Sequence, residues 1–446
     1  MAASTTIPSA STEIRRSGGH PTLLRWVFPR SFDVALAGRR VVGRDEACDA
    51  VLVGNEISRK HAEFRLEGSA VALRDLDSRN GVFVNGVRVK EARLDHGDVV
   101  RCGEWIGVVS LPGADDGRGT NAITFGELAP GLLGSGVLAR ALEPARRLTA
   151  RLPVVVQGET GTGKEGTARA VHRWSGRKGA FVPVNCAALP AELAEAELFG
   201  YRKGAFTGAD KASPGLFRAA HGGSLFLDEI LELPPPLQAK LLRAIEYQHV
   251  RALGETQDAP IDVRVIVATQ RPLGAAVAAG EFRADLQARL EGLIVVLPPL
   301  RARREDIAPL FLKFLETAEG AGRDPARIEP RLIETLCLHD WPLNVRELSL
   351  LSQRLAGVHG NEPTLKRSHL PEAMLSRAPV AGASIETQSS SDLSGPAGKA
   401  ARRTTDDEAE YEALLSAIRE HGTVAKAAVA IGVSRNRAYR LIAARK

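Results

Sequence analysis

The chain has 446 residues, of which 44% are hydrophobic, and its formal net charge is +6; this size predicts roughly three globular domains with full cores. No apolar run is long enough to span a membrane, and the N-terminus has no charged-then-apolar signal pattern. We therefore expect a cytoplasmic protein with no membrane partner. The four cysteines stand singly and far apart, which excludes a metal-ligand spacing and predicts reduced, buried thiols.

Short strands separated by turns are predicted over residues 21–112, after a Ser/Thr/Ala-rich segment, 1–20, that is expected to be a disordered tail. Residues 82–89 predict a hairpin, because the turn dipeptide Asn85-Gly86 divides two apolar, β-branched runs. The regular spacing of such strands predicts an all-β sandwich.

The polar residues of this region fall in three loops, which can converge on an anion at one end of a sandwich. The loops are Gly43-Arg44, Ser58-Arg59-Lys60-His61 and Ser78-Arg79-Asn80-Gly81. This pattern resembles the forkhead-associated (FHA) domain, a reader of phosphothreonine. The resemblance implies that Arg44 and Ser58 bond the phosphate, that Arg59 and Arg79 add charge, and that Asn80 holds the peptide backbone. It gives His61 a structural role. A sandwich that serves only docking or oligomerisation is the alternative.

Residues 113–125 are rich in Gly and Asp and predict a linker, short enough for the two domains that it joins to sense each other. From 126 to 300, strands alternate with helical patterns, which predicts a parallel α/β sheet.

A phosphate-binding loop is predicted where an apolar strand, 152–157, is followed by a glycine-rich loop and a helix, 166–174. Backbone N–H groups of such a loop surround phosphate oxygens, and its lysine adds a charge at the outer phosphates. The residues concerned are Gly158, Glu159, Thr160, Gly161, Thr162, Gly163, Lys164 and Glu165. A glycine-rich turn with an exposed lysine is the alternative.

A second half of the site is predicted at the end of the apolar strand 224–229, which carries Asp228 and Glu229. Asp228 would hold Mg²⁺, and Glu229 would orient or deprotonate the attacking water. Together with the phosphate-binding loop, this pattern predicts ATP hydrolysis with ATP and Mg²⁺ as cofactors.

Between these two motifs lies a small, glycine-rich loop with an exposed aromatic ring, composed of Gly204, Ala205, Phe206, Thr207, Gly208 and Ala209. Here the chain resembles the sigma-54-dependent transcriptional activators of bacteria, which are AAA+ ATPases, and the resemblance extends over residues 126–372. In that family this loop touches the sigma factor, and Lys-Glu at 164–165 is normal. A packed turn is the alternative for the loop.

The same resemblance implies further site residues in the α/β domain. Asn185 would contact Glu229 and link hydrolysis to the loop. Thr269 and Gln270, at the end of the strand predicted over 261–269, would sense the γ-phosphate.

Arg283 and Arg289 resemble the two arginines that reach into the neighbouring subunit's site, which implies a hexameric ring and a nearly inactive monomer. Residues 301–372 predict a small helical lid domain. Residues 341–348 resemble the family's lid motif, which implies that Arg346 contacts the nucleotide phosphates. The family usually has glycine where Leu343 stands, so a positive φ there would strain the leucine.

Residues 373–405 predict a flexible linker, and 406–446 contain three short helical patterns. The last of these resembles the helix-turn-helix of Fis-type DNA-binding domains. The last 26 residues contain six Lys or Arg and no acidic residue, which favours DNA contact over the alternative, a helical oligomerisation tail. The residues expected to contact DNA are Ser434, Arg435, Asn436, Arg437 and Arg440.

The whole pattern predicts a multidomain chain: an all-β FHA sandwich, an α/β AAA+ P-loop ATPase with an α-helical lid, and an all-α helix-turn-helix. The predicted function is a sigma-54-dependent transcription activator that binds enhancer DNA and remodels the sigma-54 RNA polymerase holoenzyme. A phosphothreonine-containing protein would regulate it through the FHA domain. Two alternatives are a phosphothreonine-docking DNA-binding repressor with a vestigial ATPase and a non-transcriptional AAA+ remodeller.

Overall fold

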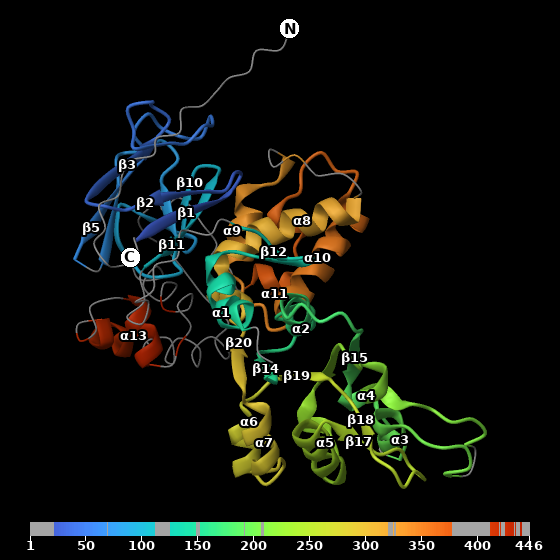
Figure 1. Cartoon of the computed structure of the whole chain (residues 1–446). Coiled ribbons are helices and arrows are strands. Elements are labelled where there is room, and N and C mark those ends of the chain that lie inside the picture. Colours follow the sequence, from blue (N-terminus) through green and yellow to red (C-terminus); the bar gives the residue numbers. More distant parts are fainter. Residues whose placement is uncertain are drawn as a thin grey trace, which may run out of the picture.

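The structure, a computed structural model, describes residues 22–68, 70–111, 125–148, 152–190, 192–206, 209–319, 324, 327–376, 411–418, 420, 424–431, 433 and 438. Figure 1 shows the β-sandwich beside the lid helices, with the α/β domain below them. No helix among these residues is long and apolar enough to cross a membrane.

The N-terminal sandwich consists of two sheets. The first has the order β2-β1-β11-β10-β7-β8, with bounds Phe32–Ala35, Leu23–Phe28, Trp105–Ser110, Val99–Cys102, Val82–Val84 and Val87–Val89. The second has the order β4-β3-β5-β6-β9, with bounds Ala50–Val51, Arg39–Gly43, Ala62–Glu67, Ala70–Asp75 and Glu91–Leu94. Apolar side chains from both sheets fill the space between them, as in an aligned sandwich.

The predicted hairpin at 82–89 is present, with the turn at Asn85 (φ 50°) and Gly86 (φ 80°). Positive φ at both central residues is the geometry that matches the twist of a two-residue hairpin. Asn85 is also buried, and its side chain bonds Asp98 at 2.9 Å, so it ties the turn to the loop before β10.

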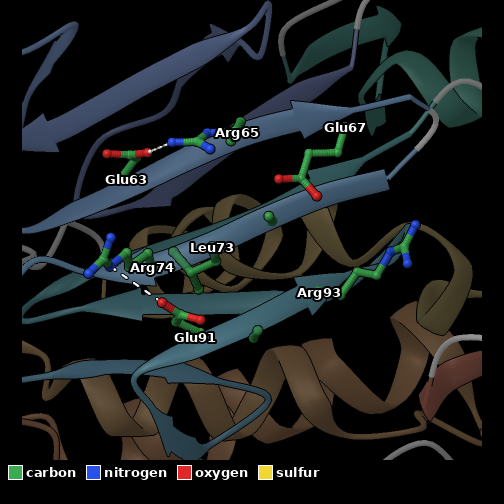
Figure 2. Close-up of a pocket in the computed structure, with 9 residues that line it drawn as sticks. Glu63, Arg65, Glu67, Leu73, Arg74, Glu91 and Arg93 are labelled. Carbon is green, nitrogen blue, oxygen red and sulfur yellow. Dashed lines mark hydrogen bonds and ion pairs between the residues drawn. The ribbon is translucent and has the colours of Figure 1, made fainter.

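Acidic and basic side chains alternate on the outer face of the second sheet, where they line a shallow pocket of about 470 Å³ (Figure 2). The charges pair with one another: Arg65 with Glu63 at 2.9 Å, and Arg74 with Glu91 at 3.4 Å. This is a solvated sheet face, and none of the predicted site residues lies on it.

The α/β domain has a parallel five-stranded sheet in the order β15-β16-β19-β14-β20. The bounds are Phe181–Asn185, Ser224–Asp228, Arg264–Thr269, Val154–Gln157 and Leu293–Val296. One face is covered by α1 (Gly136–Arg147) and α2 (Lys164–Trp174). The other is covered by α3 (Ala194–Phe199), α4 (Gly215–Ala219), α5 (Pro235–Tyr247), α6 (Leu273–Ala278) and α7 (Ala284–Leu290). Burial on both faces explains the continuous apolar runs of these strands.

Two small antiparallel pairs accompany this sheet: β12 (Gly126–Ala129) with β13 (Leu132–Gly134), and β17 (His249–Val250) with β18 (Ala259–Pro260). The strand predicted over 261–269 begins at Arg264. Ile261 and Val263 instead donate their backbone N–H groups to Gln248, at 2.8 and 3.2 Å, beside the β17–β18 pair. Strand β19 therefore begins to pair with β16 only at Arg264.

The lid comprises α8 (Ile307–Glu319), α9 (Pro330–Leu338), α10 (Asn344–His359) and α11 (Glu372–Leu375). Short 3-10 helices, η3 (Leu300–Ala302), η4 (Arg304–Asp306) and η6 (Arg367–His369), join it to its neighbours. Leu343 has φ −104°, so the positive φ that would strain a leucine does not occur at that position. The positive values fall on its neighbours Trp341 (φ 51°) and Asn344 (φ 52°).

The lid and the sandwich share one hydrophobic core. Val27, Phe28, Val99, Ile106 and Val108 of the sandwich belong to the same buried cluster as the lid residues. The sequence predicted that the sandwich and the α/β domain, joined by the short linker at 113–125, sense each other. The structure brings the sandwich into direct contact with the lid.

In the C-terminal region, residues 411–418 are helical and α13 covers Val424–Ala430. Leu414, Ala417, Ala427 and Ala428 form a small buried cluster between them. The five residues expected to contact DNA, Ser434 to Arg440, lie outside the described residues.

All four cysteines are unpaired, as predicted. Cys102, Cys186 and Cys337 are buried, but Cys48 is only half-buried and donates its thiol to the Arg59 carbonyl at 3.2 Å.

Candidate functional site

The phosphate-binding loop follows β14 at the carboxyl edge of the parallel sheet and leads into α2. Helix α2 begins at Lys164, two residues before the predicted start. Gly161 (φ 76°) and Gly163 (φ 103°) have left-handed backbones that favour glycine. A Cβ at Gly161 would also lie 2.1 Å from the Leu343 carbonyl oxygen, so the lid packs directly on the loop.

Lys164 is buried within the loop, where its ammonium group donates to the carbonyls of Gly158 at 2.9 Å and Glu159 at 3.1 Å. Burial lowers the pKa of Lys164, and the nearby carboxylates of Asp228 and Glu229 oppose that shift. The ammonium group is therefore near enough to the two carboxylates to interact with them, so one cation and two acidic groups gather at the same edge of the sheet.

Asp228 ends β16, and its carboxylate accepts the Glu229 backbone N–H at 3.0 Å. Glu229 has a left-handed backbone (φ 53°, ψ 49°), which is rare for a non-glycine residue and costs on the order of 1–3 kcal/mol. Such strain concentrates at functional sites, where the surrounding structure holds it. Asp228 offers the single-carboxylate oxygen ligand that suits Mg²⁺ bound together with phosphates. Glu165 does not share this task, because it pairs with Arg169 at 2.7 Å on the helix surface.

Asn185 lies directly beside Asp228, since the two are register partners of β15 and β16. Its side-chain oxygen accepts the Ala187 N–H at 2.9 Å and caps the 3-10 helix η1 (Cys186–Ala188). Among the hydrogen bonds of the described residues there is none from Asn185 to Glu229. A contact between Asn185 and Glu229 therefore requires one of these two side chains to change its conformation.

Thr269 and Gln270 end β19 next to the phosphate-binding loop. The carbonyl of Thr269 accepts the Gly158 N–H at 3.0 Å, and its hydroxyl donates to the Arg271 carbonyl at 2.7 Å. Thr269 is buried and Gln270 is exposed. Only Gln270 is thus open to a ligand without rearrangement.

Arg346 is exposed on the first turn of α10, close enough to Lys164 to lower its pKa. The carbon Cβ of Arg346 lies 3.1 Å from the place that a Gly161 Cβ would take. The lid thus brings a second cation to the phosphate-binding loop.

Three further lid residues that the sequence did not single out hold this loop. Arg301 pairs with Glu159 at 2.8 Å, and Arg303 donates to the Thr162 carbonyl at 3.1 Å. Asn344 is buried and donates to the Thr160 carbonyl at 2.9 Å. Because these bonds join elements about 140 to 185 residues apart, no local pattern could have revealed them.

Arg283 and Arg289 are both exposed on or beside α7. Arg289 lines a hollow of about 380 Å³ with Leu152 and Pro153, which precede β14. It therefore lies at the amino edge of the sheet, away from the phosphate-binding loop of its own chain. Arg283 pairs with Asp285 through two contacts, at 3.0 and 2.7 Å.

The loop at 204–209 protrudes from the α/β domain between α3 and α4 (Figure 1). Its base is closed by the bond from the Gly204 N–H to the Ala209 carbonyl, at 2.9 Å. Phe206 is 37% exposed and packs on one side against Tyr201, with ring centroids 5.0 Å apart. Thr207 and Gly208 lie outside the described residues.

The three polar loops of the sandwich are joined at one end. The Arg44 N–H donates to the Ser58 carbonyl at 2.9 Å, and the Arg79 N–H donates to the Ser58 hydroxyl at 3.0 Å. Asn80 donates to the Glu56 carbonyl at 2.8 Å. Arg44, Arg59 and Arg79 are exposed, and no ion pair of the described residues involves them. Three exposed arginines held by a bonded loop framework suit a dianion such as phosphothreonine.

His61 is buried and connects two of these loops. Its Nδ1 accepts the Ser58 N–H at 3.1 Å, so its Nε2 carries the hydrogen that is donated to the Gly81 carbonyl at 3.3 Å. This geometry agrees with the structural role implied for it.

We expect His61 to titrate below the ordinary histidine value of about 6.5. Burial lowers the pKa of His61, although the Gly81 carbonyl and Asp75 oppose the shift. As the pH falls, the unfolded chain therefore protonates His61 before the folded chain does. The contribution of His61 to the free energy of unfolding consequently rises with pH between its folded and its unfolded pKa and stays constant above the unfolded pKa. Deuterium exchange at the imidazole C2 position, followed by mass spectrometry over pH 4–9, measures the midpoint. A midpoint at or above 6.5 would contradict the assignment.

His359, Glu362 and His369 bring donor atoms within 4.8 Å of one another on the lid. The Nδ1 of His369 already accepts the Lys366 N–H at 3.2 Å, so its Nε2 must carry the hydrogen that points to Glu362. A nitrogen with a hydrogen has no lone pair for a metal. The cluster is a hydrogen-bonded turn in this structure.

Comparison with known proteins gives three family matches: the Sigma-54 interaction domain over residues 135–296, the FHA domain over 40–103, and the AAA+ ATPase lid domain over 301–386. The probable regulatory protein HrpS of Pseudomonas syringae pv. syringae is 48% identical over 204 residues, 46% of this chain and 68% of that protein. UacR of Escherichia coli, a putative uric acid sigma-54-dependent transcriptional regulator, is 39% identical over 312 residues, 68% of this chain and 52% of that protein.

The crystal structure of NtrX from Brucella abortus in complex with ADP aligns with a TM-score of 0.53 at 31% identity, over 70% of this chain and 69% of that one. The present chain spans about half the length of some curated relatives, 52% of UacR and 50% of the regulator DctD of Rhizobium meliloti.

Proposed function

Because this chain belongs to the family of proteins that carry the sigma-54 interaction domain, we propose that it is a sigma-54-dependent transcription activator driven by ATP hydrolysis. The observation that carries the proposal is the combination, in one domain, of a phosphate-binding loop, two carboxylates beside it and a protruding loop. Lys164 interacts electrostatically with Asp228 and Glu229, and the loop at 204–209, between α3 and α4, presents a partly exposed Phe206.

In the proposed reaction, the phosphate-binding loop and Lys164 hold the outer phosphates, and Arg346 adds charge from the lid. Asp228 would hold Mg²⁺, which neutralises charge on the phosphate oxygens when bound. Glu229 would accept a proton from the attacking water and orient it. Thr269 and Gln270 would sense the γ-phosphate. Asn185 would contact Glu229 and link hydrolysis to the loop at 204–209.

The active site is proposed to be completed between subunits of a hexameric ring. Arg289 lies at the edge of the sheet away from its own loop, which supports a role on a neighbouring subunit. An arginine supplied in trans neutralises charge on the transferred phosphoryl group and makes hydrolysis depend on assembly.

Two further partners are proposed, one for the N-terminal sandwich and one for the C-terminal region. The FHA loops with Arg44, Ser58, Arg59, Arg79 and Asn80 would bind a phosphothreonine protein that regulates the activator. The C-terminal region with Ser434, Arg435, Asn436, Arg437 and Arg440 would bind enhancer DNA. Lys and Arg contacts to phosphates would make that binding weaken with salt.

Promoter opening in vitro tests the proposal, with purified protein, sigma-54 polymerase and a supercoiled template, with and without ATP. We expect opening only with ATP, and we expect Thr207→Ala to remove opening while ATP hydrolysis persists, because the loop contacts the sigma factor and not the nucleotide. A matched control is Ser389→Ala, a hydroxyl removal far along the chain. Opening that survives Thr207→Ala would contradict the role of the loop.

If ATP is hydrolysed but the promoter does not open, either the FHA domain requires its phosphothreonine ligand or the chain acts on a protein other than sigma-54. Removing residues 1–120 is unsuitable, since it would expose the lid core that the sandwich covers. Arg44→Ala and Arg79→Ala in the intact chain remove the anion contacts alone. A chain that binds DNA and phosphothreonine but never hydrolyses ATP would indicate the repressor alternative.

A further inference from the structure

The sandwich is docked on the lid through its first sheet, formed in part by β1, β10 and β11. The lid helices α8 and α9 contact these strands, and Figure 1 shows the sandwich alongside them. The apolar part of the contact is the shared core described above. A strand in a two-layer sandwich normally alternates between buried and exposed positions, but every residue of β1 is buried. The lid therefore covers the second face of this strand.

Buried charges fix the geometry of the contact. Arg101 of β10 bonds Glu334 of α9 at 2.8 Å, and each side chain is 7% exposed. The guanidinium of Arg101 also lies 3.7 Å from the centre of the Phe83 ring. Arg25 of β1 lies 3.6 Å from Glu305, and both are buried. Removing one partner of a buried pair leaves an uncompensated charge, so this arrangement is specific.

One short segment, Arg303–Asp306, contacts both the sandwich and the phosphate-binding loop. Arg303 donates to the Thr162 carbonyl at 3.1 Å. Its neighbour Arg304 donates to the Gly97 carbonyl of the sandwich at 2.9 Å, and Glu305 pairs with Arg25. Successive residues of one turn therefore point to the two sides.

All four residues of the segment are buried. Arg303 is 1% exposed and lies 3.7 Å from the carboxylate of Asp306, which is fully buried. The hydroxyl of Ser135, at the start of α1, donates to Glu305 at 3.3 Å. A packed turn of this kind cannot shift at one residue without moving its neighbours.

The phosphothreonine loops lie at the opposite end of the sandwich from Gly97. Strand β7 shows this, because Val82 pairs with Cys102 beside the Asn80 loop, whereas Val84 pairs with Val100 toward Gly97. A phosphopeptide can therefore bind while the sandwich stays docked.

We propose that Arg303–Asp306 is a positioning element of the nucleotide site, and that docking of the FHA sandwich on the lid holds this element, and with it the phosphate-binding loop, in the binding geometry. The inference rests on the proposed nucleotide-binding role of that loop. Undocking the sandwich then weakens nucleotide binding. By linkage, nucleotide strengthens docking by the same factor.

The test uses the full-length chain and the buried pair, since changes in Arg303 itself could unfold the lid. The variants are Arg101→Glu, Glu334→Arg, the double exchange, and the milder Glu334→Gln. The control is Arg74→Glu with Glu91→Arg, an ion pair on the outer face of the same sandwich, exposed at 66% and 71% (Figure 2). Affinity for a fluorescent ADP analogue gives the binding readout, and amide hydrogen exchange over residues 97–108 and 330–338 reports docking.

We expect each single charge reversal to raise exchange in both segments and to weaken nucleotide affinity at least about fivefold. The double exchange should partly restore both the slow hydrogen exchange and the nucleotide affinity, and the control pair should change neither quantity. ADP should lower exchange in the wild-type segments. Raised exchange with affinity within about twofold of wild type would overturn the proposal. A wild-type chain that binds no nucleotide, in the same way as Lys164→Ala, would instead overturn the proposed function.

Discussion

Replacing Glu229 with glutamine is expected to slow ATP hydrolysis on the order of 10²–10⁴-fold, while nucleotide affinity stays near the wild-type value. Glutamine keeps the size of the side chain and loses only the basic oxygen that takes the proton from water. The left-handed backbone of Glu229 (φ 53°) is bonded through its N–H to the Asp228 carboxylate and through its carbonyl to the Glu232 N–H, and neither bond uses the Glu229 side chain. Steady-state phosphate release and ADP-analogue binding, measured on the same preparation, separate chemistry from binding.

Two matched variants sharpen this result. Lys164→Ala should abolish both binding and hydrolysis, since it removes the buried ammonium at the outer phosphates. Glu232→Gln, three residues further on in η2 (Ile230–Glu232), should leave both unchanged. Hydrolysis that persists in Glu229→Gln at more than about a tenth of the wild-type rate would show that another group serves as the base.

The local parts of the fold could be predicted because their signals are local. The hairpin at 82–89 follows from a turn dipeptide between β-branched runs, and strand β16 (Ser224–Asp228) ends one residue before the predicted end at 229. The strand before Thr269 was predicted three residues too long. Periodicity does not reveal that Ile261 and Val263 bond Gln248, the residue that precedes β17 in a small antiparallel pair.

The contacts between domains could not be predicted in the same way. Arg303 and Asn344 reach the phosphate-binding loop from the lid, and in the sequence they are ordinary polar residues near helix starts. One signal of the docked sandwich was present: Leu23–Phe28 has almost no polar alternation, which is typical of a strand covered on both faces. Which surface covers it depends on the whole fold.

Mixing two inactive variants is expected to restore ATP hydrolysis if the arginines act between subunits. Arg289→Ala or Arg283→Ala alone should lower the rate on the order of 10³–10⁵-fold, as loss of an arginine in trans does. In a ring assembled from Arg289→Ala and Glu229→Gln subunits at equal amounts, about a quarter of the interfaces join a subunit with an intact Glu229 to a subunit with an intact Arg289. Those interfaces should hydrolyse ATP, so the mixture should greatly exceed the sum of its parts.

The matched control mixes Glu229→Gln with Lys164→Ala. Both defects lie on the same side of the proposed interface, so no arrangement of these subunits forms an intact site, and no recovery is expected. The position of Arg289 at the far edge of the sheet from its own loop makes action within one chain sterically unfavourable. If the first mixture is as inactive as the control while both form rings of the same mass, the arginines do not act in trans. The dependence of hydrolysis on assembly would then need another explanation.

Because Arg283 is paired with Asp285, recovery with Arg289→Ala but not with Arg283→Ala would assign the trans contact to Arg289 and leave Arg283 as a partner within its own subunit.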